Sequence, residues 1–182
     1  TKKLLNGGAA VNATVTAANA ADLTKATVIG GSEDTQVGAT VVITAKTDAT
    51  AASDVTTATW ASTSTALGGT GAITVQGVSF SFAATDTVQN VLDTINDAGI
   101  GITATFTAGS GITLSTDAVG SAATMTVGSA TGVMAGIATA TGTDATLTIT
   151  GSPTYTAEGN KITIQSGTAK GLEFEVSGGA LI

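Results

Sequence analysis

Residues 83–106 of the chain, AATDTVQNVLDTINDAGIGITATF, carry the one clear helical pattern in 182 residues. Asp86, followed by Gln89 three residues later, forms a D-x-x-Q pattern of the kind that caps the start of a helix. Gly99 suits the left-handed position that follows a helix. Between these signals, four apolar residues recur with helical spacing and form a single stripe: Val88, Val91, Leu92 and Ile95. The sequence therefore predicts one capped, amphipathic helix over residues 86–98.

Strand patterns flank this helix on both sides. Residues 72–82, AITVQGVSFSF, alternate apolar and polar side chains around Gln76-Gly77, which predicts a hairpin with a short turn. The alternation resumes after the helix in three further segments: residues 102–106, 112–114 and 123–127. The predicted order over residues 71–127 is therefore β-β-α-β-β-β.

The helix is predicted to cover one face of a small antiparallel sheet. A helix of about three turns is unstable alone in water, so its apolar stripe needs a partner surface. Ile73, Val75, Ile102 and Ile112 lie in the neighbouring strand patterns and can provide that surface. Burying four such side chains contributes roughly 6–10 kcal/mol before entropy costs, a large share of the net stability of a small domain.

Short strand-like segments make up much of the remaining chain. In the N-terminal part they lie within residues 11–17, 25–31 and 39–45, and in the C-terminal part within residues 147–149, 162–164 and 172–176. Threonine is abundant, and it favours strands. The predicted fold class is mainly β (α+β), with small antiparallel sheets and one short capped helix packed on a sheet.

Two lobes are expected from the changes in pattern along the chain. Residues 1–10 read as the end of a connection to another region, and the start at Thr1 indicates a fragment or a processed form. Residues 11–70 are assigned to a first lobe, with a polar linker over residues 47–70 in which Trp60 is interpreted as a plug over a small core. Residues 71–182 are assigned to a second lobe, with the helical unit at 71–127 and C-terminal hairpins at 145–176.

The composition excludes several classes of chemistry. The chain has no Cys and no His, so it cannot use disulfides, thiols, imidazole catalysis or the usual zinc ligands. Six lysines and no arginine stand against thirteen acidic residues, for a net charge of −7. This balance disfavours nucleic acid and anionic membranes as partners. No apolar run approaches the roughly 20 residues that span a bilayer.

The acidic residues suggest a calcium site only weakly. Glu33 is adjacent to Asp34, and Asp93 and Asp97 are four residues apart on the predicted helix, but neither pair has the spacing of a known calcium loop. Three further carboxylates lie near predicted turns, where polar residues are common: Asp117, Asp144 and Glu158. Solvated surface charge is the preferred interpretation, and no catalytic, cofactor-binding or metal-binding residue and no cofactor is assigned. A glycosidase-type carboxylate pair stays open as the least favoured alternative, because no pair is set apart from the others.

Two segments resemble one family. Residues 71–106, GAITVQGVSFSFAATDTVQNVLDTINDAGIGITATF, are similar to the flagellin inserted motif, which recurs in bacterial flagellins and in hook-associated and cap proteins of the flagellum. Residues 1–8, TKKLLNGG, resemble the segment where a flagellin leaves its helical rod, and KGLEFEVSGGALI at 170–182 weakly resembles the return to that rod. Residues 9–70 are not covered by this resemblance.

The resemblance implies a structural role outside the cell. The chain would be the exposed outer region of a flagellin, contributing to the motility filament and to its antigenic surface, with O-linked glycans on its Ser/Thr-rich loops as an open question. The long terminal helices through which flagellins polymerise are missing from this sequence. Self-assembly with other flagellin subunits is therefore expected of the full-length protein, and the isolated fragment is expected to be monomeric. The alternatives are the outer region of a flagellar cap or hook-associated protein, and a surface adhesin module that binds glycans or host matrix.

Overall fold

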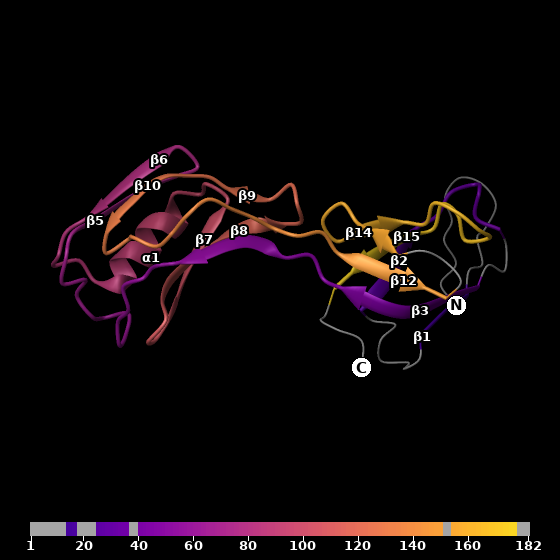
Figure 1. The fold of residues 1–182 in the computed structure, drawn as a ribbon, viewed down its shortest axis with the longest axis horizontal. Helices are drawn as coiled ribbons and strands as arrows, with labels where there is room; N and C mark the ends of the chain where they lie inside the picture. The colour runs from indigo at the N-terminus through magenta and orange to yellow at the C-terminus, as the bar shows by residue number, and fades with distance from the viewer. Residues whose placement is uncertain (1–13, 18–24, 37–39, 151–153, 178–182) are drawn as a thin grey trace. The chain divides into compact units, whose positions relative to one another are not determined.

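The computed structural model describes residues 14–17, 25–36, 40–150 and 154–177, and these are mainly β, with small sheets and one short helix, as the sequence predicts (Figure 1). The described residues form two compact units. The described residues up to Thr50 and from Thr143 onward make one of them, which we call the discontinuous unit. Residues Ala51–Gly142 make the other, which we call the inserted unit.

This division differs from the lobes expected at 11–70 and 71–182. Residues 51–70 belong to the inserted unit, and the C-terminal strands belong with the N-terminal ones in the discontinuous unit. The physical reason is long-range pairing, because strand β3 (Thr40–Thr47) pairs with β12 (Thr146–Ile149) across the whole inserted unit. Residues 1–10, expected to be a connection to a rod, lie outside the described residues.

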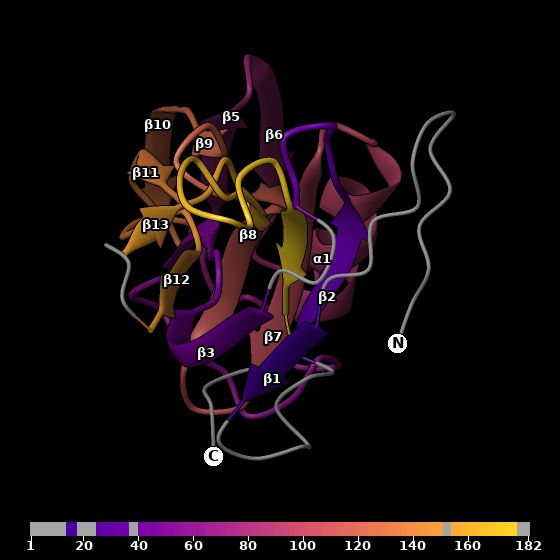
Figure 2. The ribbon, with the colours of Figure 1, turned by 90° about the vertical axis from the view of Figure 1, so that its right-hand side faces the viewer.

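The discontinuous unit contains two sheets. One has four strands in the order β1-β3-β12-β13 (Figure 2), and the other has three in the order β14-β15-β2. The remaining strand bounds are β1 Thr14–Ala17, β2 Ala26–Gly30, β13 Tyr155–Thr156, β14 Lys161–Thr163 and β15 Glu173–Val176. β1 and β3 pair in parallel, whereas the other pairings between strands of this unit are antiparallel among the described residues. Its core is aliphatic, with Phe174 and Tyr155 as buried aromatic side chains.

The inserted unit contains the predicted hairpin and helix. β5 (Gly71–Val75) and β6 (Val78–Phe82) pair in antiparallel fashion around Gln76 and Gly77, which both have positive φ, at 49° and 77°. That conformation is the type I′ turn that matches the twist of a hairpin. The other strands are β4 Ala51–Val55, β7 Ile102–Thr107, β8 Gly111–Val119, β9 Thr124–Met125, β10 Val127–Gly132 and β11 Ala140–Thr141, giving sheets β10-β5-β6, β4-β8-β7 and β11-β9.

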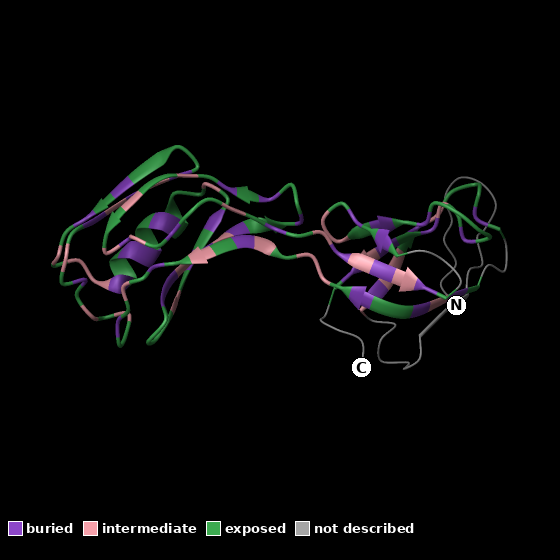
Figure 3. Cartoon of the chain, viewed as in Figure 1, coloured by how far each residue is buried: buried purple, intermediate pink, exposed green. Residues whose placement is uncertain are grey.

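Helix α1 (Val88–Asp97) buries the predicted stripe, with its four apolar residues at most 9% exposed (Figure 3). They share one core cluster with Ile73, Val75, Ile102 and Ile112, as expected. Gly99 has a φ of 59° and ends the helix as predicted.

The N-terminal cap differs from the prediction. Thr87, not Asp86, is the N-cap, and it exchanges hydrogen bonds with Asn90 in a capping box. Asp86 instead accepts a hydrogen bond from the backbone N–H of Ala83 at 2.8 Å, in the turn that precedes the helix. Both D-x-x-Q and T-x-x-N fit a capping pattern, and the backbone path from β6 decides between them.

Residues 47–70 are not a polar linker. Their first part contains β4, which pairs with β8 and buries Ala52 completely. Trp60 and Leu67 are buried in the core of the inserted unit, and Trp60 Nε1 donates a hydrogen bond to the Leu67 carbonyl at 3.2 Å. Trp60 therefore does fill a core position as predicted, but it belongs to the same core as the helix.

Candidate functional surfaces

The point where the chain enters and leaves the inserted unit is closed by threonines. The backbone N–H of Thr50 donates to the Thr143 carbonyl at 2.8 Å, and that of Thr143 donates to the Thr50 carbonyl at 3.2 Å. Their Oγ1 atoms lie 2.8 Å apart, and the same separation joins Thr47 Oγ1 to Thr146 Oγ1. The segment that leads into the inserted unit and the segment that leads out of it, which we call the two crossings, are therefore held side by side by backbone and side-chain hydrogen bonds.

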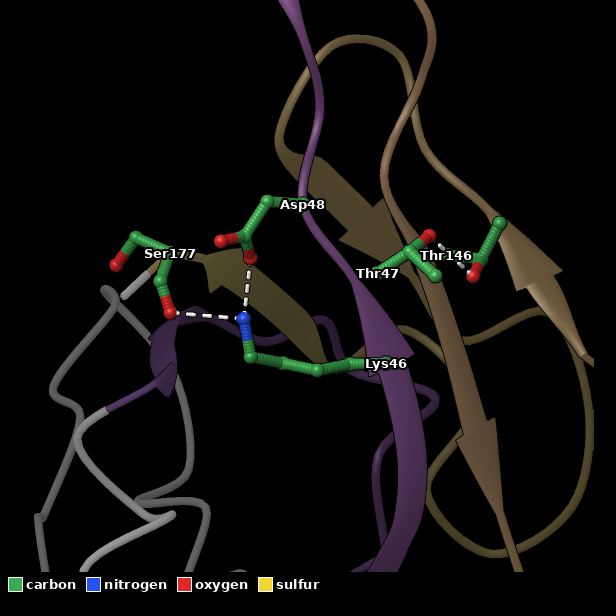
Figure 4. A network of polar contacts seen from close by, with 5 residues as sticks. All are labelled: Lys46, Thr47, Asp48, Thr146 and Ser177. Atoms are coloured by element: carbon green, nitrogen blue, oxygen red, sulfur yellow. Dashed lines mark hydrogen bonds and ion pairs between the residues drawn. The ribbon is translucent and has the colours of Figure 1, made fainter. Parts of the chain in front are cut away.

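A buried lysine lies next to this junction (Figure 4). The side chain of Lys46 has no exposed surface, although lysine is rarely buried without a partner. Its Nζ forms an ion pair with Asp48 and donates a hydrogen bond to the Ser177 carbonyl at 2.9 Å. Ser177 in turn donates its N–H to the Lys25 carbonyl at 2.9 Å. Lys46 thus connects β3, the crossing segment and the end of β15.

Sequence reasoning does not identify this cluster. Lys46 is one of six lysines in the chain, and nothing in its neighbours marks it as buried. Ser177 lies 131 residues away, so only the tertiary structure brings the two together. The available signal is a charged residue inside an alternating strand segment, which by itself fits an exposed position equally well.

The acidic residues singled out in the sequence are exposed or bonded to other groups of the protein. Asp34 pairs with Lys170 at 3.0 Å in an exposed salt bridge, and Asp93 accepts a hydrogen bond from Gln89 at 2.7 Å on the outer face of α1. Asp117 accepts from Thr103 Oγ1 at 2.6 Å, and Asp144 accepts from the Gly159 N–H at 3.0 Å. Asp97 is exposed on α1, and Glu33 is exposed in the discontinuous unit. Within the described ranges, no three acidic residues gather in a group that could hold a metal ion.

An open groove of ≈ 620 Å³ lies in the discontinuous unit. Glu158 and Glu173 line it together with Lys161, Gln165 and the buried Tyr155, whose hydroxyl lies 3.2 Å from Ser166 Oγ. Two carboxylates reach this concave surface, so it is one place where a carboxylate-pair hypothesis can be tested. Across the described part of the chain, no helix has the length and apolar character needed to cross a membrane.

The outer face of sheet β4-β8-β7 carries hydroxyl groups. The register places Thr103, Ser115 and Ser53 in one row across three strands, with Thr105 opposite Thr113 in the adjacent row. Thr103, Thr105 and Ser53 are exposed. The inserted unit also contains five aspartates and no glutamate, lysine, arginine or histidine: Asp54, Asp86, Asp93, Asp97 and Asp117. Its surface is therefore polar, mostly uncharged, and acidic where it is charged.

Comparison with known proteins yields matches of fold. No protein-family model matches the sequence, and no curated protein matches it significantly. Among solved structures, the chain is similar to the D2-D3 domains of the flagellar cap protein FliD from Escherichia coli, with a TM-score of 0.50 and 18% identity over 74% of this chain and 81% of that one. It is also similar to the flagellar cap protein FliD from Bdellovibrio bacteriovorus, with a TM-score of 0.50 and 14% identity over 74% of this chain and 85% of that one. At identities this low, the structural matches show a likeness of fold.

Proposed function

We propose that this chain is the outer, structural region of an axial protein of the bacterial flagellum. The observation that carries the proposal is the fold likeness to FliD D2-D3 domains, which extends over most of both chains. The sequence of residues 71–106 supports it independently, since it resembles a motif shared by flagellins, hook-associated proteins and cap proteins. The motif forms one core in the structure, in which the stripe of α1 packs with residues of β5, β7 and β8.

The proposed role is mechanical and does not involve catalysis or a cofactor. The inserted unit is attached through two crossings that are bonded to each other at Thr50 and Thr143, so it is held by a double connection. An acidic, hydroxyl-rich surface remains hydrated and resists non-specific association. In this proposal the chain displays that surface outside the cell, on the flagellum, where it is also the part that antibodies meet.

Two kinds of axial flagellar protein, a cap protein and a flagellin, are candidates, and each is favoured by a different observation. The fold likeness is to cap proteins, whereas residues 1–8 resemble the segment that enters the outer region of a flagellin. In both cases the full-length protein assembles with other axial subunits. Nucleic acid and membrane are not proposed as partners, and an adhesin module is the alternative from another functional class.

Immunogold labelling of intact cells that produce this protein tests the proposal. Gold along whole filaments is the result expected of a flagellin, and gold restricted to the filament tip is the result expected of a cap protein. Gold over the cell body with none on flagella would overturn the proposal and favour the adhesin. A strain deleted for the gene serves as the control for antibody specificity.

A further inference from the structure

Strand β6 is an edge strand whose outward backbone groups face no neighbouring strand in the sheet order β10-β5-β6. The register with β5 pairs Val75 with Val78, on either side of the two-residue turn. A two-residue hairpin is closed by a hydrogen-bonded pair, and such pairs alternate along an antiparallel ladder. The N–H and C=O groups of Ser79 and Ser81 therefore point away from β5.

Other edges in the inserted unit are closed by side chains. On β7, the Asn96 amide accepts from the Ala104 N–H at 2.7 Å and donates to the Ala104 carbonyl at 3.1 Å. On β10, the Thr139 hydroxyl accepts from the Val127 N–H at 2.9 Å. At β4 the Asp54 carboxylate accepts from the Ala138 N–H at 2.9 Å, which holds the segment around Ala138 against this strand. Within residues 51–142, all of which the structure describes, no side chain closes β6 at Ser79 or Ser81 in this way.

The sequence of β6 also lacks the usual protection of an edge strand. Edges are commonly protected by lysine, by proline or by inward-pointing charge. Residues 78–82, VSFSF, contain none of these, and no charged residue occurs between Gly71 and Thr85. Val78 is 38% exposed and is one of the few large hydrophobic residues at the surface.

The segment is complementary to itself. If two copies pair in antiparallel fashion about Phe80, Phe80 lies opposite Phe80 and Val78 lies opposite Phe82. Ser79 then lies opposite Ser81, and both are the residues whose backbone groups point outward, so each serine pair can exchange two backbone hydrogen bonds. Val78 of one copy then lies across from Phe82 of the other, on the same face of the extended sheet, an arrangement that suits apolar cross-strand pairing.

From this register we infer that β6 is a self-association surface, on which the β6 strand of a second copy of this chain binds in antiparallel orientation to extend the sheet across a two-fold axis. An isologous contact of this kind closes on itself as a dimer. One five-residue strand pair buries less area than a stable interface needs, so the dissociation constant is expected at about 10⁻⁴–10⁻³ M. The chain is then monomeric when dilute, in line with the sequence expectation. This inference does not rest on the proposed flagellar role.

The first test follows amide hydrogen exchange of the full chain by NMR, in dilute and in millimolar solution. At about 1 mM the Ser79 and Ser81 amides are expected to exchange about two- to fivefold more slowly than in the dilute sample, because roughly half to four fifths of the chain is dimeric at that dissociation constant. The Phe80 amide already pairs with β5 and is expected to be protected equally in both samples. Protection of Ser79 and Ser81 that does not change with concentration would overturn the inference.

The second test measures mass by sedimentation equilibrium for two variants and a matched control. Ser81→Pro removes an outward N–H and leaves the β5–β6 bonds in place, because edge positions tolerate proline. The double variant Ser79→Lys/Ser81→Lys puts like charges opposite each other in both serine pairs. Both are expected to remain monomeric at concentrations where wild type dimerises, whereas Thr105→Lys, exposed on β7, still dimerises. A wild type that stays monomeric to millimolar concentration, or a dimer that persists in the double variant, would refute the β6 contact.

Discussion

At the scale of the residue, Lys46 and Asp48 have unequal environments. The lysine side chain has no exposed surface, whereas the aspartate side chain is 33% exposed. Removing the partner of a buried charge is strongly destabilising because the charge cannot be hydrated, while a partly exposed carboxylate can recover water. The two halves of this ion pair should therefore respond differently to substitution.

We expect Asp48→Ala to lower the free energy of unfolding by about 3–5 kcal/mol. Lys46→Met keeps the volume and the apolar stem of the lysine, and it should cost only about 1–2 kcal/mol, chiefly through the Ser177 carbonyl that loses its donor. Urea unfolding of the discontinuous unit, followed through Tyr155 fluorescence, measures both. A larger loss for Lys46→Met than for Asp48→Ala would contradict the assignment of Lys46 as the group that depends on its partner.

The N-cap of α1 is also decided by single residues. Thr87 accepts from the Asn90 N–H at 3.2 Å, and Asn90 Oδ1 accepts from the Thr87 N–H at 2.9 Å. Thr87→Ala removes the side-chain acceptor and should cost about 1 kcal/mol, in the range typical of N-caps. Thr87→Ser retains a hydroxyl and is the matched control. Thermal unfolding monitored by circular dichroism would contradict the assignment if the alanine and serine variants melted together.

At the scale of the element, α1 provides much of the inserted unit's core. The cluster around it contains aliphatic residues of β5, β7 and β8, with Phe80, Phe82 and Trp60 as its buried aromatics. A ten-residue helix has little stability of its own, so it persists through this packing, and the strands lose their cover if it detaches. The helix and its strands should therefore unfold as one unit.

Leu92→Asp should unfold the inserted unit at ambient temperature. It removes an apolar side chain that is 9% exposed and puts a carboxylate at the same buried site, a change expected to cost about 4 kcal/mol or more. Loss of α-helical circular dichroism and of the buried Trp60 fluorescence would register it. Thr94→Asp, on the exposed face of the same helix, is the control. A melting curve like that of wild type for Leu92→Asp would remove the basis for treating α1 as the cover of these strands.

At the scale of the whole molecule, the chain is nested, because one unit is inserted into a connection of the other. Thr50 and Thr143 exchange two backbone hydrogen bonds, which is the geometry of the pair that closes a two-residue hairpin. The discontinuous unit therefore contains a ready-made position for a tight turn where the inserted unit is attached.

Replacing Ala51–Gly142 by Asn-Gly should leave the discontinuous unit folded. The new turn would join Thr50 directly to Thr143, and β3 and β12 would become a simple hairpin with their present register. A dispersed NMR spectrum and a cooperative urea transition are the expected results. In the control variant the same dipeptide replaces only Gly71–Gly142. This variant keeps β4 but lacks β8, the strand with which β4 pairs. An unfolded Asn-Gly variant would show that the discontinuous unit depends on the inserted one.

The sequence by itself determined the local elements of this protein. The period of Val88, Val91, Leu92 and Ile95 specifies a helix with one buried face, and Gln76-Gly77 between two alternating segments specifies a hairpin turn. The mainly β class and the position of Gly99 after the helix can also be predicted from the sequence, because each depends on residues that are close together in the chain. These features could be predicted without knowledge of the fold.

Only the tertiary structure decided how distant segments combine. The low-complexity sequence of residues 47–70 looks like a linker, yet β4 and Trp60 are buried because strands and core residues far along the chain cover them. The nesting of the two units, the burial of Lys46 beside Ser177 and the closing of the β7 edge by Asn96 are contacts between segments that no local pattern relates. Pairing partners and burial depend on loop closure and packing across the whole chain, and these leave no periodic mark on the residues that take part.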